Sequence, residues 1–594
     1  MDMIRRLSIF FGLALLVLPG PSIAQAPLDH RELPADQQIL HALNRLTFGA
    51  RPGDALEIRR IGLDNWVELQ LNPKRIDDKA ADQFMSRYTI LNRDQNELLR
   101  AFNEAQRERR MARRDDTTER MPRQAMTDRP EQRTDGIALT RRAMINQLQS
   151  SRVARAVSSN RQLEEVLTDF WLNHFNVFAQ KGPPQAYYLA EYDRDVIRPR
   201  ALGKFRDLLG AVAKSPAMLF YLDNARSMGD TSKPRLATVD RRLQRGLPRE
   251  MRQNLERLSN GGLNENYGRE LLELHTLGVD GGYTQQDVVN VSRALTGWTI
   301  RQPAGGGGFV FRPEMHDAAE KIVLGQRLPA GRGMEEGEQV LDILARHPST
   351  AKHIARKLAI RFVSDRPPQA LIDRAAAVLL RTDGDIREVV RSIITSNEFY
   401  ASTAYRSKVK SPFEVVVSAL RALDAEPDST PRTAQVVAYL GQPIYGHQAP
   451  NGYPETGDAW MNAGAILNRI NFGIAVAAGR IPGARIDAVR GIDSLRNASR
   501  EKQVDAISRA LLGGVISPET RQVLTSGENP LLERNASAVT SQPAEGAMMG
   551  DGMEPQAGRP RANPLGRPGA PPPQLTGIAQ VVGLALGSPE FQRR

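Results

Sequence analysis

Apolar residues recur at helical spacing along most of this chain of 594 residues. In the first such segment Ile39, Leu43 and Leu46 repeat at intervals of four and three positions, which places them on one face of a helix. The same periodicity predicts helices over residues 39–48, 53–61, 163–178, 205–214, 265–277, 285–295, 350–362, 368–380, 386–396, 412–423 and 459–478, and another that Asp64 is expected to cap. The sequence therefore predicts an all-α fold.

Strand signals are few. Two short apolar runs, residues 308–311 and 322–324, lie close to the glycine run 305–308 and are predicted to pair with each other as one hairpin. The predicted architecture is a multi-helix globular domain with a small β-hairpin appendage.

Two segments have compositions that do not favour packing. Residues 104–136 are densely charged and contain no aromatic residue, which predicts a solvated helix or a disordered insertion. Residues 535–574 are rich in Pro and Gly and are predicted to be a disordered insertion. The expected organisation is a signal peptide, an N-terminal helical part, the charged insertion, the main helical part, the Pro/Gly insertion and a packed C-terminal segment, over residues 1–24, 25–103, 104–136, 137–534, 535–574 and 575–594.

The N-terminus has the order of regions found in a bacterial export signal. Basic Arg5 and Arg6 precede an apolar run at residues 7–18, and Ala24 follows in a small-residue cleavage pattern. No later stretch has the roughly 20 apolar residues that a spanning helix needs. We therefore expect a periplasmic or secreted protein with no transmembrane segment after signal removal, exported by the secretory or the twin-arginine route.

Composition narrows the possible chemistry and partners. The chain has no Cys, which excludes disulfides, thiolate metal sites and a Cys nucleophile. Its net charge of +12 arises from 80 basic and 68 acidic residues, and the densest basic stretch, within residues 104–136, is nearly balanced by acidic residues. Nucleic-acid binding, which concentrates one sign of charge on one face, is not expected. Attraction to an anionic polysaccharide is more compatible with this charge.

The segment 264–278 is the most concentrated site candidate. Asn264 is expected to cap a helix that Gly278 ends, and Glu270 and Glu273 share a face of it, with His275 nearby. Carboxylates at this spacing act as an acid–base pair or hold a hard cation, so these three residues are the candidate catalytic set. The alternative is structural, with Arg269 paired to Glu273 and Glu270 neutralised by another Arg.

Three further residues are candidate ligands of a divalent metal, the one cofactor that the residue types suggest. His174 lies on the apolar face of its helix and needs a partner, which could be a carbonyl, a carboxylate or a metal. His316 and Asp317 are adjacent in the hairpin region, where a turn can aim both at a ligand. By contrast, His347 and His353 match no helical face and are interpreted as structural, with Ser349 capping the next helix.

The segment 441–460 is rich in Gly, Pro and aromatic residues, which specify a rigid irregular loop. Such a loop either walls a pocket or forms a packed connection, and the sequence leaves both open.

Five ordered blocks resemble the bacterial domain-of-unknown-function family number 1800. These are H-A-L-N-R-L-T-F-G-A-R-P, W-L-N-H-F, N-E-N-Y-G-R-E-L-L-E-L-H-T-L-G-V with Y-T-Q-Q-D-V and A-L-T-G-W behind it, the H-D pair, and N-G-Y-P-E-T-G-D-A-W. The resemblance implies one long helical family domain in an exported protein, with no established activity. The family's recurrent positions map to His174, Asn266, Arg269, Glu270, Glu273, Gly278, Trp298, His316 and Asp317, whereas Tyr453 stands where many members carry Trp. The resemblance also implies a neighbouring exported protein that looks like a sulfatase or phosphatase.

Two function classes follow from these observations. In the first, Glu270, Glu273, His174, His316 and Asp317 converge on one polar pocket that hydrolyses a cell-envelope or extracellular polymer or ester, with a carboxylate or a metal-bound water as the base. In the second, the protein is a non-catalytic partner or assembly factor of the sulfatase-like protein.

Overall fold

The computed structural model describes residues 31–115, 130–229, 262–301, 307–485, 495–528, 565 and 575–594. The predicted signal peptide, residues 1–24, lies outside the described residues, as do residues 116–129 of the charged segment and most of the Pro/Gly segment 535–574. None of the described helices is long and apolar enough to cross a membrane.

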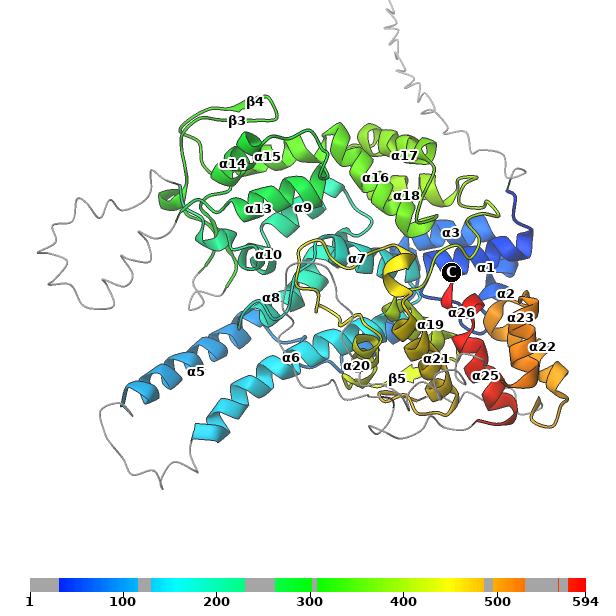
Figure 1. Ribbon diagram of the computed structural model, residues 1–594. Coiled ribbons are helices and arrows are strands. Elements are labelled where there is room, and N and C mark those ends of the chain that lie inside the picture. Colours follow the sequence, from blue (N-terminus) through cyan, green and yellow to red (C-terminus); the bar gives the residue numbers. More distant parts are fainter. Residues whose placement is uncertain are drawn as a thin grey trace, which may run out of the picture.

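The fold is all-α with small antiparallel strand pairs, as predicted (Figure 1). Its α-helices are α1 (Ala35–Leu46), α2 (Asp54–Ile61), α3 (Leu63–Leu71), α4 (Lys79–Met85), α5 (Gln95–Asp115), α6 (Pro130–Ser158), α7 (Gln162–His174), α8 (Gln185–Glu191), α9 (Phe205–Ala213), α10 (Pro216–Tyr221), α13 (Glu265–Glu270), α14 (Gln285–Ala294), α15 (Met334–Ala345), α16 (Pro348–Phe362), α17 (Gln369–Arg381), α18 (Ile386–Ile394), α19 (Pro412–Ala422), α20 (Arg432–Tyr439), α21 (Ala463–Ala477), α22 (Arg500–Leu512), α23 (Pro518–Ser526), α25 (Gly577–Gly587) and α26 (Pro589–Gln592). Two π-helical turns, η4 (Tyr192–Ile197) and η9 (Leu271–Thr276), continue α8 and α13.

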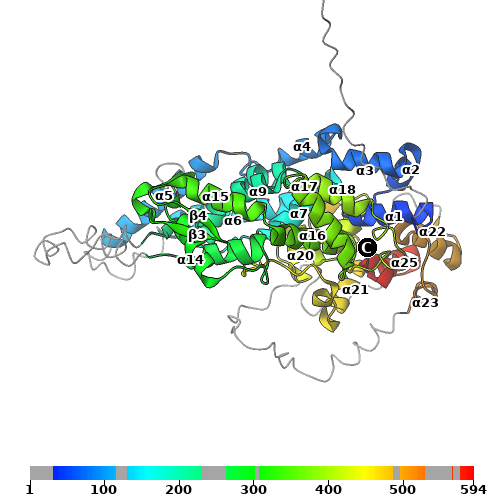
Figure 2. The same ribbon diagram turned by 90° about the horizontal axis from the view of Figure 1, so that it is seen from above.

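Helix α7 lies at the centre of the molecule. Trp171 and the neighbouring Phe170 and Phe175 are buried, and the Trp171 indole N–H donates to the carbonyl oxygen of Ala201 at 3.0 Å. Figure 2 shows α2 to α4 along one side and α21 on the other, with α7 and α16 between them. Buried apolar side chains from α1 through α26 form one continuous cluster among the described residues. Helix α7 is therefore embedded in this core, whereas α16 keeps one exposed face, with Lys352 and Arg356.

Segments far apart in sequence meet beside α1 and α3. Leu33 donates its backbone N–H to the Tyr400 carbonyl at 3.2 Å, and the Arg387 side chain donates to the Leu71 carbonyl at 2.9 Å. At the other end of the chain, α25 packs against α21, where a Cβ on Gly473 would lie 2.7 Å from the Gly583 carbonyl oxygen. Because Gly473 has no side chain, the two helices can approach this closely.

The strands pair differently from the prediction. Strand β1 (Trp298–Ile300) pairs with β2 (Phe309–Phe311), and β3 (Lys321–Val323) pairs with β4 (Gln326–Leu328). A third pair joins β5 (Glu426–Pro427) to β6 (Ala484–Arg485). The predicted hairpin between 308–311 and 322–324 is therefore wrong, because each run takes a partner that carries a weaker strand signal. Periodicity alone does not encode which short strands pair.

Three predicted helix boundaries are also corrected. Asp64 lies inside α3, whose N-cap is Gly62, and the cap of α16 is His347, whose Nδ1 accepts from the backbone N–H of Ser349. Helix α7 ends at His174 rather than at residue 178, so the residues that follow it are free to bond with a loop. By contrast, Asn264 caps α13 as predicted, and Gly278 has the left-handed φ of +87° predicted for a helix stop.

Candidate functional site

His174 ends α7 and is fixed on both sides of its ring. Its Nε2 lies 3.2 Å from the carbonyl oxygen of His275, and its Nδ1 lies 2.8 Å from the Lys357 ammonium. Because a carbonyl can only accept and an ammonium can only donate, Nε2 carries the proton and Nδ1 is the acceptor. The imidazole is therefore neutral and positions the ammonium of Lys357.

Three histidines surround this lysine. The rings of His275 and His353 lie 6.3 and 6.1 Å from that of His174, centroid to centroid. Burial and the charge of Lys357 lower the pKa of His275 to about 3 and that of His353 to about 4. Burial also lowers the pKa of Lys357 to about 8, against the opposing pull of Glu455. The cluster thus holds one cation among neutral rings at neutral pH.

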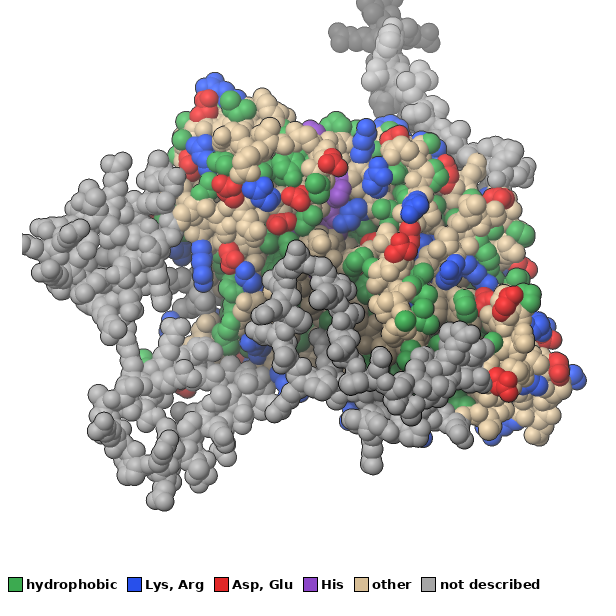
Figure 3. All heavy atoms as spheres, in the orientation of Figure 1, with side chains coloured by type: hydrophobic (Ala, Val, Ile, Leu, Met, Phe, Trp, Pro, Cys, Tyr) green, Lys and Arg blue, Asp and Glu red, His purple; other side chains and the backbone are tan. Residues whose placement is uncertain are grey.

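One face of α16 carries side chains of this cluster and, one turn further on, Arg361. His353, Lys357 and Arg361 are spaced four residues apart, so they share one face of the helix, turned toward α7. The Arg361 guanidinium lies 3.5 Å from Asp169 of α7 and 3.2 Å from Glu455. Figure 3 shows histidine, basic and acidic side chains close together near the middle of the face seen in Figure 1.

Arg361 lines a cavity of about 70 Å³ with mixed polar and apolar walls, which has room for water. Asp169 and Glu455 line it, as do the more deeply buried Arg152 and Glu414. The side chains of Asp169 and Glu455 keep 22% and 17% of their exposure, so both carboxylates can reach solvent. Arg152 also binds Asp169, at 3.0 Å.

The two cavity carboxylates have opposite pKa shifts. Burial raises the pKa of Asp169 above its ordinary value, although Arg152 and Arg361 oppose the rise. Burial acts in the same sense on Glu455, but Arg361 and Lys408 outweigh it and hold the pKa of Glu455 below its ordinary value. Two carboxylates with pKa values driven apart in one cavity are the pattern of a general acid and a general base.

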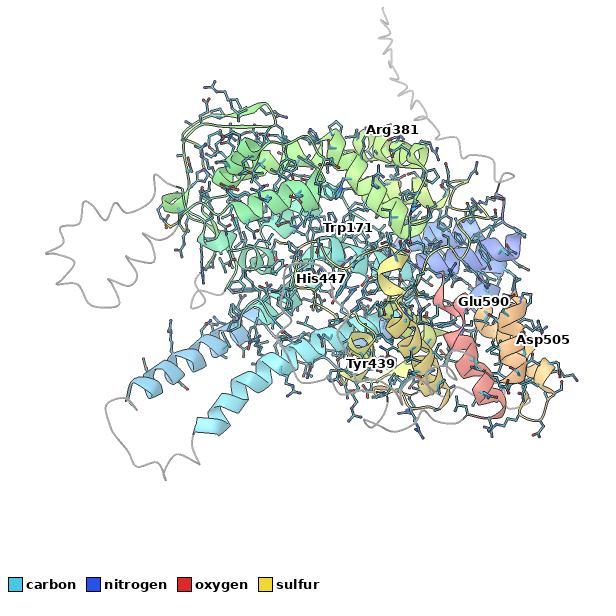
Figure 4. All side chains as sticks on the ribbon, viewed as in Figure 1. Trp171, Arg381, Tyr439, His447, Asp505 and Glu590 are labelled. Carbon is cyan, nitrogen blue, oxygen red and sulfur yellow. The ribbon has the colours of Figure 1, made fainter. Side chains whose placement is uncertain are left out.

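The loop 441–460 forms one wall of this cavity and is also packed against the end of α7, so both interpretations left open by the sequence apply to it. The Asn173 side chain bonds the loop three times: it accepts from the Tyr453 N–H at 2.7 Å, donates to the Tyr453 carbonyl at 2.8 Å and donates to the Glu455 carboxylate at 3.3 Å. Asn176 donates to the carbonyls of His447 and Ala449. Figure 4 shows His447 on this loop and Trp171 in α7. Gly452, at φ +72°, packs so close that a Cβ would lie 2.2 Å from the Asn173 carbonyl oxygen.

Glu270 and Glu273 lie where α13 becomes the π-helical turn η9, a conformation frequent at functional sites. Burial and the charge of Glu273 raise the pKa of Glu270. Glu273 accepts from the Tyr283 hydroxyl at 3.3 Å, and Arg269 lies 3.5 Å from Glu265 rather than pairing with Glu273. The two carboxylates are half-buried, and their predicted acid–base role stays a prediction.

His316 and Asp317 belong to a different network. Asp317 binds Arg293 at 2.8 Å, and the His316 Nε2 lies 3.4 Å from Glu336, which also accepts from the fully buried Lys321 at 2.6 Å. In the described part of the chain no bond joins this network to His174, Glu270 or Glu273.

The predicted metal-ligating residues are therefore divided. His174 bonds within the histidine cluster, whereas His316 and Asp317 bond within the network of Lys321. Among the described residues, no group of three or more His, Asp and Glu side chains is arranged to hold a metal ion. The metal-ligating role of His174, His316 and Asp317 remains a prediction without a shared centre.

Sequence reasoning missed Asp169, Glu455, Lys357 and Arg361, and it interpreted His353 as structural. One signal was available: His353, Lys357 and Arg361 repeat every four residues within an apolar helix. That spacing places three polar side chains on one buried face of the helix. Burying them costs free energy unless they have hydrogen-bond or ion-pair partners.

Comparisons with known proteins give one result. No curated protein and no solved structure matches the chain. A family model does match, over residues 41–593, which is nearly all of the chain and includes every residue of the cavity described above except Arg594. The chain belongs to the family described as protein of unknown function (DUF1800).

Proposed function

We propose that this protein is an exported hydrolase in which Asp169 is the general acid and Glu455 the general base. The observation that carries the proposal is the opposite pKa shift of two solvent-reaching carboxylates that line one cavity and share Arg361. The substrate class is an ester or glycosidic polymer of the cell envelope or its surroundings.

The reaction is a balanced acid–base hydrolysis. Glu455 takes a proton from a water in the cavity while that water attacks the reacting carbon, and Asp169 gives its proton to the leaving oxygen as the carbon–oxygen bond breaks. The products are an alcohol and an acid or hemiacetal. Arg361 is a positioning residue, because it holds both carboxylates and keeps Glu455 ionised. Export to the periplasm or the medium is part of the proposal and rests on the N-terminal sequence.

The proposal requires a pH profile with an acidic optimum. Activity falls at low pH as Glu455 is protonated, and it falls again as pH rises through the raised pKa of Asp169, which then has no proton to give.

Two matched variants test which carboxylates act. With 4-nitrophenyl butyrate and dye-labelled peptidoglycan as probes, Asp169→Asn and Glu455→Gln are each expected to lower kcat/KM by about 100-fold or more, whereas Glu270→Gln should stay within about threefold of the wild type. If instead Glu270→Gln lowers kcat/KM by about 100-fold and the other two variants do not, the active site lies at Glu270 and Glu273, the pair predicted from sequence. If the folded wild type turns over neither probe, the proposal that it hydrolyses esters or glycosidic bonds is rejected.

A second candidate function is a non-catalytic partner of a sulfatase- or phosphatase-like exported protein. One observation favours it: α5 and α6 extend together away from the body of the molecule (Figure 1), an arrangement suited to reaching another protein. If this candidate is right, the wild type turns over neither probe, and replacing residues 104–136 by a short Gly/Ser linker should abolish co-purification of the partner while the helical circular-dichroism spectrum of the body is retained.

A further inference from the structure

A second cavity, separate from the proposed active site, lies among α21, α23, α25 and α26. Its volume is about 440 Å³, within the range of small-molecule sites, and its walls are mostly apolar. Ile466 and Ile470 of α21, Val523 of α23 and Leu584 of α25 supply these walls, and the exposed Met461 lies at its edge. An apolar chain would therefore gain burial there.

One buried cation that lines this cavity, Arg469, has no carboxylate among the described residues as an ion-pair partner. Arg469 is 2% exposed, and its guanidinium donates to the Gln592 side-chain oxygen at 2.8 Å and to the Lys410 carbonyl at 2.9 Å. Both acceptors are neutral, and its Nε has no hydrogen-bond partner. Within the described residues no carboxylate lies within ion-pair distance of Arg469. A buried cation with only neutral acceptors is costly, and a ligand anion would offset that cost.

The surrounding charges favour an anion on balance, although the carboxylate of Glu414 acts on both Arg469 and Lys410 from beyond ion-pair distance. Lys410 is buried next to Arg469, with its ammonium 3.1 Å from the Ser418 hydroxyl and over the Phe591 ring at 4.1 Å. The exposed Arg593 lines the same cavity, opposed by one acidic lining residue, Glu519. The basic groups lie toward α21 and α26, whereas Glu519 is on α23, so an anionic head group is placed at the α21–α26 end.

We propose that this cavity binds a long-chain fatty acid, with the acyl chain among Ile466, Val523 and Leu584 and the carboxylate directed to Arg469. The Gln592 amide oxygen, which now accepts from Arg469, is the group that the carboxylate would replace. A neutral chain would leave the guanidinium with no carboxylate of the described residues within ion-pair distance, and a cationic amphiphile would be repelled.

Binding of oleate to the purified full chain tests the proposal, with oleyl alcohol as the uncharged ligand of equal length. Oleate, below its micellar concentration, is expected to displace a fluorescent fatty acid at one site per chain and to bind about tenfold more tightly than the alcohol. Ile466→Trp, which fills the cavity, should weaken both ligands at least about tenfold. Val515→Trp, at an exposed apolar position outside the cavity, is the matched control and should change neither.

The charge is tested separately. Arg469→Gln should bring oleate affinity to that of the alcohol, and if that variant does not fold, Arg593→Gln at the accessible edge should weaken oleate by about threefold and spare the alcohol. Asp169→Asn should leave oleate binding unchanged, so the fatty-acid site and the hydrolase proposal fail independently. The proposal is overturned if oleate shows no saturable binding or if Ile466→Trp leaves its affinity intact. It is also overturned if the wild type is a dimer that binds no oleate and Ile466→Trp converts it to a monomer, because the cavity would then be an interface between two copies of the chain.

Discussion

Arg361 joins three carboxylates, so its removal gives a sharp test of how the buried charges are balanced. In an Arg361→Met variant, Asp169 keeps Arg152 at 3.0 Å and Glu414 keeps Arg594 at 3.0 Å. Glu455 loses its ion-pair partner and retains the Asn173 amide at 3.3 Å. Glu455 is then left partly buried with only the more distant charges of Lys408 and Arg594, and the loss of its ion pair is expected to cost up to about 3–5 kcal/mol of unfolding free energy, the range for a buried pair.

The loss must depend on pH in a definite direction. In the wild type the folded-state pKa of Glu455 is lowered, so its pairing stabilises the fold above its unfolded pKa and that contribution is lost as pH falls. In the variant the folded-state pKa of Glu455 should be higher than in the wild type, because Arg361 is the strongest of the charges that lower it, so the carboxylate stabilises the fold less at neutral pH. The difference between variant and wild type should therefore be largest near pH 7.5 and shrink toward pH 4.

Urea unfolding followed by circular dichroism at pH 7.5 and 4.5 measures both quantities. Arg361→Lys is the matched control: it keeps the charge but cannot bridge two carboxylates with one fork, and should cost about 1–2 kcal/mol with little pH dependence. A cost of Arg361→Met below about 1 kcal/mol at pH 7.5, or one that grows on acidification, would refute the assignment of Glu455 as the dependent group.

Three further outcomes are expected. Lys321→Met leaves Glu336 buried without its ion-pair partner at 2.6 Å and should cost about 3 kcal/mol by urea unfolding, with Lys321→Arg much milder. Gly452→Ala combines a left-handed φ with a 2.2 Å clash and should lower the thermal midpoint more than Gly441→Ala, whose φ is also positive but whose Cβ would meet nothing within 4 Å. Lys357→Met removes a charge that lowers the pKa of His174, so NMR titration should find this pKa higher than in the wild type, although burial still keeps it below 6.5. An unchanged pKa would argue against the contact between His174 and Lys357.

The helices were predictable because their signal is local. Helix α18 (Ile386–Ile394) begins and ends close to the predicted bounds, since Asp385 caps it and its apolar residues repeat at helical spacing. The pairing of Trp298–Ile300 with Phe309–Phe311 was not predictable, because three-residue strands carry too little pattern to specify a register. Helical periodicity describes one element at a time, whereas strand pairing depends on how the helices around it pack.

The candidate site was predictable only in part, for a related reason. The burial of His174 follows from its position on the apolar face of α7, and the structure bears this out. Its partner Lys357 is 183 residues away, so the bond that fixes its tautomer has no local signature. The loop 441–460 could be predicted as rigid from its composition, but its place against α7 depends on Asn173, which the sequence marks only as one polar residue in an apolar block.

The opposite pKa shifts of Asp169 and Glu455 arise from the whole charge cluster rather than from either carboxylate alone. Asp169 contacts two guanidinium groups and Glu455 contacts one, so a count of partners would predict the lower pKa for Asp169. The opposite result arises because burial and two neighbouring carboxylates outweigh both arginines at Asp169, while Lys408 and Arg594 add to Arg361 at Glu455. Exchanging the proposed acid and base roles would therefore require a change at Lys408, in the segment before α19, or at Arg594, after α26, and not in the carboxylates themselves.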